Sequence, residues 1–197
     1  FLFARELVRL GHDVTILTNS PAARWRFKEY MHDGVRIVES PDLFWGSLRT
    51  GWDPINVLRR SRYLRTQSFD LIHAFDTRPT VILPALFYKF AVRSLPLVID
   101  WADWWGRGGA ITLRSNKTLN WLFSPVETFF EEYFRRFANH TTVISSLLKK
   151  RAMGLGIPLK DMTTMPSGAD MLTLYPVSKN RARRLLGIPQ SSHVCIF

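Results

Sequence analysis

The chain has 197 residues, of which 46% are hydrophobic and 22% are charged, a composition that excludes an intrinsically disordered protein and allows one domain with a sizeable core. Lys and Arg total 27 against 16 Asp and Glu, and the formal net charge of +11 favours nucleic acid, an anionic membrane face or a phosphate-bearing ligand as a partner. The single cysteine, Cys195, excludes a disulfide framework and fits a reducing compartment, and no apolar run is long enough to span a bilayer.

The first part of the chain alternates helical and extended patterns. Apolar residues from Phe3 to Leu10 recur at helical spacing, and Gly11 suits the left-handed residue that ends such a helix. Runs of β-branched and apolar residues predict strands at residues 14–18, 35–38 and 69–75. Further helices are predicted at residues 22–31, 54–66 and 80–92.

The second part of the chain continues the alternation. Strands are expected at residues 97–99, 141–144 and 161–165, and short helices at residues 147–153 and 181–186. Between them we predict a long helix, kinked near Pro125, with an apolar stripe along one face. The members of this stripe are Leu119, Leu122, Phe123, Val126, Phe130, Tyr133 and Phe137.

Strands that alternate with helices nearly throughout a chain are typical of a parallel sheet that is covered on both faces. We therefore predict an α/β fold, a Rossmann-like doubly wound parallel sheet. The segments expected to be buried in this sheet are residues 14–18, 69–74, 97–100 and 141–144.

One stretch is more informative than the others: PLVIDWADWWGRGG, in which a buried strand opens into acids, indoles and glycines. Ligands bind at the carboxyl ends of strands in open α/β sheets, and carboxylates there accept hydrogen bonds from sugar hydroxyls or take a proton. Asp100 and Asp103 are therefore candidate catalytic residues, with helix capping or an ion pair to Arg107 as the alternative. Gly108 and Gly109 could let backbone amides approach a phosphate or hydroxyl, unless they only make the loop flexible.

The strand predicted at residues 69–75 leads into a second group of polar side chains. His73 lies inside the strand and is either a substrate contact or a hydrogen-bonded core histidine. Asp76 and Arg78 follow the strand, where a ligand contact is favoured, although the two could instead pair and fix the loop. Asp76 and Asp100 should project into one crevice if their strands are neighbours, because adjacent parallel strands end on the same side.

Four motifs in this order resemble those of family-4 glycosyltransferases. ARELVRLGHDVTILT is similar to their first helix and second strand, and FDLIHAFDTRP to a strand that ends in a histidine-containing element. TTVISSLLKKR followed by MPSGAD resembles a VISxxxxxR and PNGVD pair, and ARRLLGIP followed by HVCIF resembles the passage into a second domain. The resemblance implies a GT-B enzyme, in which two Rossmann-like domains face each other across a cleft.

The resemblance also implies a reaction and its substrates. It implies transfer of a sugar, with retention of anomeric configuration, from a nucleotide-sugar donor to a carbohydrate or lipid-linked acceptor, with no obligatory metal and no cofactor. The family pattern places Ser145 and Arg151 in the cleft, and Ser167, Gly168 and Asp170 near the donor. Without the family, Ser145 is only a helix cap and the later segment only a tight turn.

The chain departs from the family pattern at two positions near the expected site. His73 is followed by Phe75, where many relatives have a second histidine, and Asp100 or Asp103 stands where many relatives have a histidine. These departures leave the identity of the acid, base or sugar-positioning residue open.

The resemblance also predicts a division of the chain. Residues 1–176 should form the amino-terminal, acceptor-side domain without its first strand, which is expected before Phe1. Residues 177–197 should form a linker and the start of the donor domain, which is expected beyond Phe197. The fragment alone is therefore expected to be inactive.

The positive charge raises two partners other than substrates, an anionic membrane and nucleic acid. Trp45, Trp52 and the arginines from Arg59 to Arg65 could meet an anionic membrane or form a solvated helix face. Nucleic acid is not expected, because the basic residues are spread over several helices without a recognised motif. The five histidines show no metal-ligand spacing. We expect a cytoplasmic protein, with peripheral attachment to the inner face of the membrane as a variant, and a non-catalytic nucleotide- or sugar-binding module as the alternative function.

Overall fold

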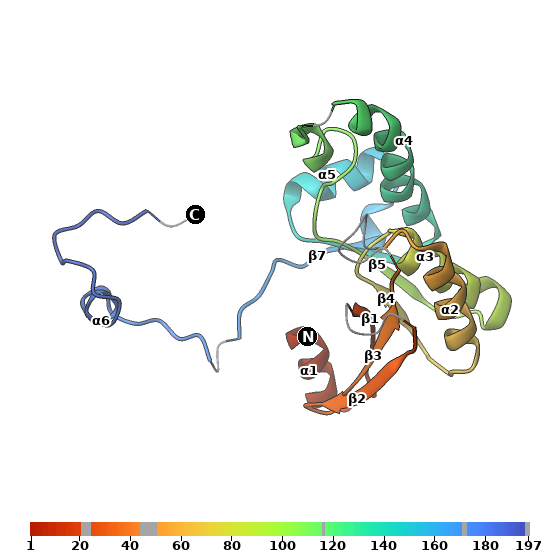
Figure 1. The fold of residues 1–197 in the computed structure, drawn as a ribbon, viewed down its shortest axis with the longest axis horizontal. Coiled ribbons are helices and arrows are strands. Elements are labelled where there is room, and N and C mark those ends of the chain that lie inside the picture. Colours follow the sequence, from red (N-terminus) through yellow and green to blue (C-terminus); the bar gives the residue numbers. More distant parts are fainter. Residues whose placement is uncertain (21–24, 44–50, 116, 171–172, 196–197) are drawn as a thin grey trace. The chain divides into compact units, whose positions relative to one another are not determined.

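The computed structural model describes residues 1–20, 25–43, 51–115, 117–170 and 173–195 (Figure 1). The chain forms two compact units, Phe1–Pro166 and Ser167–Phe197, and each unit is described by itself. The larger unit contains two β-sheets with helices packed on them. The smaller unit contains α6 (Lys179–Leu185), in the region where the sequence predicted a helix.

The first sheet has the strand order β1-β3-β2. Its strands are β1 (Thr15–Ser20), β2 (Lys28–His32) and β3 (Val35–Pro41). β1 and β3 are the two strands that the sequence predicted here, and they run parallel with Leu17 opposite Val38. β2 pairs with the other side of β3 in the antiparallel direction.

The helix predicted for residues 22–31 is wrong where the structure can be compared with it, because its second half forms strand β2. Residues 22–24 lie outside the described part of the chain. Asp33 and Gly34 have φ angles of 47° and 76°, the positive values that a tight hairpin turn needs. This turn folds β2 back onto β3, where the Tyr30 hydroxyl donates a hydrogen bond to the Glu39 carboxylate at 3.0 Å.

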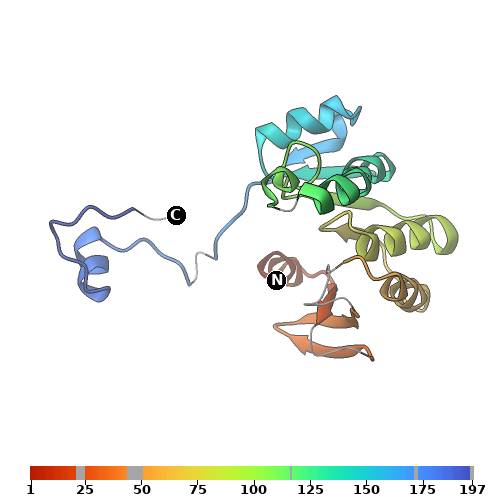
Figure 2. The same ribbon diagram turned by 45° about the horizontal axis from the view of Figure 1, so that its top comes forward.

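Helices cover both faces of the first sheet (Figures 1 and 2). They are α1 (Leu2–Arg9) and α2 (Pro54–Arg65). Ala4 of α1 packs against Val35 and Ile37, which point to one face because side chains alternate along a strand. Arg60 of α2 reaches the opposite face, where its Nε donates to the Ser40 hydroxyl at 2.8 Å.

The second sheet has the strand order β4-β5-β6-β7, and all of its strands are parallel. The strands are β4 (Ile72–Ala74), β5 (Leu97–Trp101), β6 (His140–Val143) and β7 (Met162–Thr164). Ala74 lies opposite Ile99, and Ile99 lies opposite Thr141. The α/β fold with a parallel sheet flanked by helices is therefore confirmed.

The sequence predicted one parallel sheet, whereas the described strands form two. β1 and β4 are edge strands of separate sheets and share no backbone ladder within the described residues. A cavity of about 140 Å³ is lined by residues of β1, β4, α2 and α3, among them Leu17, Leu64 and His73. Side chains link the two halves instead, since Arg60 Nη1 donates to the backbone oxygen of Thr80 at 3.1 Å.

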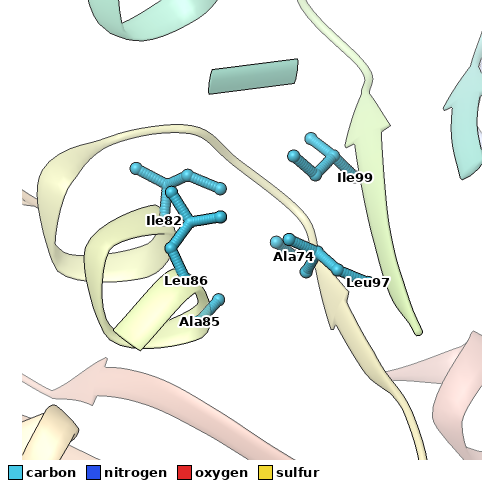
Figure 3. Close-up of a cluster of buried hydrophobic side chains, with 6 residues drawn as sticks. All are labelled: Ala74, Ile82, Ala85, Leu86, Leu97 and Ile99. Atoms are coloured by element: carbon cyan, nitrogen blue, oxygen red, sulfur yellow. The ribbon is translucent and has the colours of Figure 1, made fainter. Parts of the chain in front are cut away.

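Helices that follow β4, β5 and β6 pack on the second sheet. They are α3 (Pro79–Phe87) with a π-helical turn (Tyr88–Val92), α4 (Lys117–Tyr133) with a 3-10 turn (Phe134–Phe137), and α5 (Ser146–Gly154). Short 3-10 turns also occur at Ala110–Leu113 and Leu159–Asp161. In Figure 3, Ile82 and Leu86 of α3 point toward Ala74, Leu97 and Ile99 of the sheet. Full burial of one such side chain contributes about 1.5–3 kcal/mol.

The predicted long helix exists as α4, but its apolar stripe does not form one buried face. Phe130 packs against the core of the second sheet, whereas Leu122 and Val126 are exposed. The positions that α4 buries include Glu127 and Glu131. A helix with buried carboxylates and exposed apolar side chains needs polar partners on its inner side, and the loop after β5 supplies them.

Candidate active site

Loops that leave the carboxyl edge of the second sheet carry half of the predicted site residues. They follow β4, β5 and β6 at residues 75–78, 102–109 and 144–145. Because β4, β5 and β6 are parallel neighbours, these loops come to the same edge. The Arg78 guanidinium of the first loop lies 6.0 Å from the centre of the Trp105 ring of the second.

Asp76 and Arg78 fix the shape of the loop after β4. The Asp76 carboxylate accepts hydrogen bonds from the backbone N–H groups of Thr77 at 2.6 Å and Arg78 at 3.1 Å. Its second oxygen lies 3.1 Å from Arg78 Nε, so the pairing left open by the sequence is present. Both side chains are partly exposed, and a ligand contact by either remains a prediction.

Asp100 does not face water, as the strand-end position had suggested. It is the fourth residue of β5, is 5% exposed, and accepts a hydrogen bond from the Thr142 hydroxyl of the neighbouring strand. Its backbone oxygen accepts a further hydrogen bond from Arg135 Nη1 at 3.2 Å. Asp103 lies two residues beyond the strand end and is exposed. The structure therefore separates two acids that the sequence treated alike.

His73 is a half-buried histidine enclosed by aromatic rings. Its ring stacks on Phe75 at 4.2 Å between centres and meets the edge of Phe3 from α1 at 5.7 Å. Burial lowers the pKa of the imidazole, while the nearby Asp100 acts in the opposite direction. Within the described chain Nε2 is buried without a hydrogen-bond partner, so His73 is held by packing.

Gly108 and Gly109 belong to a loop that closes on Trp104. The Ala110 N–H donates to the Trp104 backbone oxygen at 2.9 Å, and the indole Nε1 donates to the Arg107 oxygen at 2.8 Å. A Cβ on Gly109 would lie 2.1 Å from the Trp104 oxygen, and Gly108 has a φ of +81°. These glycines are needed for the close contact with Trp104, and their role in binding a substrate remains a prediction.

Glu131 is a residue near the site that the sequence reasoning missed. It is fully buried, and its carboxylate accepts hydrogen bonds from the Trp101 indole at 3.2 Å and the backbone N–H groups of Trp105 and Gly106 at 2.9 and 2.8 Å. Burial raises the pKa of Glu131, although these donors and Arg135 act against the shift. A Cβ on Gly106 would lie 2.1 Å from the carboxylate, so this loop and Glu131 fit only with glycine there.

Arg135 is a second missed residue, one helical turn from Glu131. Its guanidinium lies over the Trp101 ring at 4.0 Å and its Nε donates to the Glu131 backbone oxygen at 2.8 Å. Burial lowers the pKa of Arg135 to about 9, against the pull of Glu131, Asp76 and Asp100, so it stays charged at neutral pH. The sequence offered only an acid and a base four residues apart, a spacing that is common on exposed helix faces and does not indicate burial.

Ser145 and Arg151 lie on α5 and its cap. The Ser145 hydroxyl accepts a hydrogen bond from the Leu148 N–H at 3.3 Å, which is the capping role left open by the sequence. Arg151 pairs with Glu132 and lies over the Trp104 ring at 4.3 Å. Arg151 therefore supports the loop after β5 from the side.

The other predicted residues are not brought to this edge by the described contacts. Ser167, Gly168 and Asp170 belong to the smaller unit, whose placement relative to the larger unit is not determined. Of the side chains considered for a membrane face, Trp45 lies outside the described residues. Arg60 is buried, and Trp52 is half-buried against Phe130 at 5.3 Å.

The described residues contain neither a candidate metal site nor a candidate membrane span. No group of three or more His, Cys, Asp or Glu side chains in this part of the chain could hold a metal ion. Likewise, none of the described helices combines the length and apolar character that crossing a bilayer requires.

The fold defines the class of protein. The structure is similar to that of sucrose-phosphate synthase (tll1590) from Thermosynechococcus elongatus, with a TM-score of 0.69 and 13% sequence identity. The similarity covers 96% of this chain and 46% of the synthase, so the chain spans about half the length of that protein. At this identity the likeness shows the fold alone, which is one half of a GT-B fold.

The family follows from the sequence. The model of Glycosyltransferase Family 4 matches residues 1–171, and the chain therefore belongs to this family. The resemblance drawn from the four motifs is thereby confirmed. None of the curated proteins compared with the chain matches it.

Proposed function

We propose that the chain forms the acceptor-side half of a retaining glycosyltransferase that transfers a sugar from a nucleotide-sugar donor to a hydroxyl acceptor. Membership of family 4 supports this proposal. The observation that carries it is the meeting of two strand-end loops, where Arg78 lies over Trp105 and the exposed Asp103 stands nearby in the chain. The edge offers a cation, an indole surface and a carboxylate, the groups that bind and orient a sugar.

Asp103 and Asp100 have different roles in this proposal. Asp103 is exposed, so we assign to it the contact with the acceptor hydroxyl, either as hydrogen-bond acceptor or as base. Asp100 remains a candidate catalytic residue, but its carboxylate already accepts the Thr142 hydroxyl and is almost fully buried. The role that these contacts support is to fix the end of β5, where the loop that carries Asp103 begins. The remaining candidate contacts are His73, Asp76, Arg78, Gly108, Gly109, Ser145, Arg151, Ser167, Gly168 and Asp170.

The proposal also states what the chain should do without a donor-binding domain. Transfer requires donor and acceptor to be held together, and that positioning accounts for a large part of the rate. We therefore expect the 197-residue chain by itself to bind acceptors without transferring sugar. We place the reaction in the cytoplasm, since the lone Cys195 is an exposed free thiol, which a reducing compartment tolerates.

The test is a binding measurement on the chain with acceptor sugars and nucleotide sugars as separate probes. Asp103→Asn should weaken acceptor binding about 10- to 100-fold, because hydrogen bonds to a charged group contribute roughly 1.5–3 kcal/mol. Asp13→Asn, at an exposed acid outside the site, is the matched control and should bind as the parent chain does.

The same experiment distinguishes the proposed function from the alternative, a non-catalytic nucleotide- or sugar-binding module. Tight binding of a nucleotide sugar, together with acceptor binding that does not depend on Asp103, would indicate a nucleotide-sugar-binding module and contradict the acceptor-side assignment. Turnover of a nucleotide sugar by the purified chain would contradict the expected need for a second domain.

A further inference from the structure

A set of large apolar side chains is exposed along α4 and on the 3-10 turn before it, and we call this set the α4 patch. Its members are Leu113, Trp121, Leu122, Val126 and Phe129, with exposed fractions of 87%, 78%, 56%, 46% and 46%. Leu122, Val126 and Phe129 follow helical i, i+4, i+7 spacing, so they lie on one face of α4. Exposed apolar surface of this extent usually marks an interaction site.

The exposure follows from where α4 lies. The backbone N–H of Arg107 donates to Thr128 Oγ1 at 3.0 Å, and that of Gly106 donates to Glu131 at 2.8 Å. The last third of α4 is therefore level with the loop after β5. The turns that precede it extend past the carboxyl edge of the second sheet (Figure 1). The members of the patch that lie on these turns, Trp121, Leu122 and Val126, are exposed there.

The orientation of α4 about its own axis is also fixed. Glu127 and Glu131 are at most 1% exposed, and Glu127 lies 2.8 Å from Arg114 Nη1. Rotating the helix to bury the α4 patch would break this ion pair and the three hydrogen bonds that Glu131 accepts. Because breaking buried charge pairs is strongly unfavourable, the patch stays on the outside.

The charged residues next to the α4 patch in the sequence have one sign. Residues 104–126 include Arg107, Arg114 and Lys117 and contain no Asp or Glu. Arg114 is paired with Glu127, which leaves Arg107 and Lys117 as the cations. The carboxylates of α4 itself are on its inner side or paired, since Glu132 bonds to Arg151. An apolar centre with a tryptophan and a cationic surround is complementary to a lipid bilayer with anionic headgroups.

We propose that the α4 patch docks the protein on an anionic lipid surface. The apolar side chains enter the boundary between headgroups and acyl chains, and Arg107 and Lys117 meet the lipid phosphates. This deepens the proposed function, since docking through α4 brings the loop of Asp103 to the surface where a lipid-linked acceptor resides. The surface differs from the one predicted on Trp45, Trp52 and the arginines from Arg59 to Arg65, in which Arg60 is buried and Trp52 half-buried while Arg62 and Arg65 are exposed.

The test is co-flotation of the chain with vesicles of phosphatidylcholine, alone or mixed with phosphatidylglycerol. The chain should float with the mixed vesicles and much less with the neutral ones. The double variant Trp121→Ala/Leu122→Ser should weaken this binding at least about tenfold, because binding scales with buried apolar area. Lys117→Ala should weaken it about fivefold. Trp25→Ala removes an equally exposed tryptophan, 72% against 78%, and should bind as the parent chain does.

Several results would overturn the docking proposal. Equal binding by the Trp121/Leu122 and Trp25 variants would exclude the patch, and equal flotation with neutral vesicles would exclude the anionic surface. A dimer that the double variant dissociates, with no flotation by the parent chain, would show that a second copy covers the patch. The vesicles contain neither sugar nucleotide nor acceptor, so failure of the transferase proposal would leave this result unchanged.

Discussion

Glu131 is a carboxylate without access to water that organises the loop after β5. Donors to it come from Trp101, Trp105 and Gly106, which are 25 to 30 residues away in the sequence. Bonds between a carboxylate and N–H groups are charge-assisted and strong, which offsets the cost of burying the acid. The position of the loop that carries Asp103 therefore depends on a residue of α4.

Removing this carboxylate should destabilise the chain severely. Glu131→Ala leaves two backbone N–H groups and an indole N–H without their acceptor, and it removes one of the negative charges near the buried Arg135, so we expect a loss of roughly 3–5 kcal/mol. Glu132→Ala, the adjacent acid on the same helix, removes a partly exposed pair and should cost about 1 kcal/mol or less. Urea unfolding of both variants measures the difference, and equal losses would contradict the role given to Glu131.

His73 makes the stability of the fold depend on pH. Burial holds its pKa below the ordinary value of 6.5, so the folded chain binds this proton less readily than the unfolded chain does. The contribution is fully present above pH 6.5 and is lost as the pH falls through the lowered pKa of the folded state.

The variant His73→Gln should accordingly lose part of the decrease in the urea midpoint that the parent chain shows on acidification from above pH 6.5. His12→Gln, at an exposed histidine, is the control and should keep the full decrease. If His73→Gln and the parent chain lose stability in parallel, the imidazole does not carry the effect.

The loop after β5 is an element whose glycines are set by packing. Gly109→Ala would place a Cβ 2.1 Å from the Trp104 backbone oxygen, and since backbone cannot move aside cheaply, we expect a loss of about 1–3 kcal/mol. Gly154→Ala provides the comparison, because no atom lies within 4 Å of that Cβ and alanine favours a helix by up to about 1 kcal/mol. Opposite shifts in melting temperature are expected, and a Gly109→Ala chain as stable as its parent would refute the packing role.

Elements that depend on local pattern were predicted well from the sequence. The apolar runs that became β5 and β6 and the serine that caps α5 needed only neighbouring residues. β2 was missed because an exposed strand has no apolar alternation, and its pairing depends on the turn at Asp33 and Gly34. The apolar stripe on α4 was wrongly predicted to be the buried face of the helix. The buried face is polar instead, because Glu131 binds partners that are distant in the sequence.

For the candidate site, too, the sequence indicated some features and not others. The rule that ligands meet the carboxyl ends of strands pointed to Asp76, Arg78 and Asp103 without knowledge of any contact. It could not distinguish Asp103 from Asp100, because three residues of sequence separate an exposed side chain from one held by the neighbouring strand. Arg135 could not be predicted from the sequence, because its partners come together only when β5 and α4 pack.

At the scale of the whole larger unit, the division into two sheets has a consequence for how amide protons exchange with solvent. No backbone ladder joins β1 to β4 in the described strands, so opening one sheet does not require breaking the hydrogen bonds of the other. The core under the first sheet is also smaller, with Ala4, Val35 and Ile37 as its buried members. Regions of a native protein that open separately show separate levels of protection.

We therefore expect two groups of slowly exchanging amides under native conditions. The amides of β1 and β3 should exchange through a partial opening, at a lower free energy than those of β5 and β6, whose protection should approach the global value. Hydrogen exchange measured in low urea resolves the two groups, and a single common free energy would show that α2 and α3 couple the sheets fully. The half of the molecule that presents Asp76 and Asp103 is thus the part expected to persist when the other half opens.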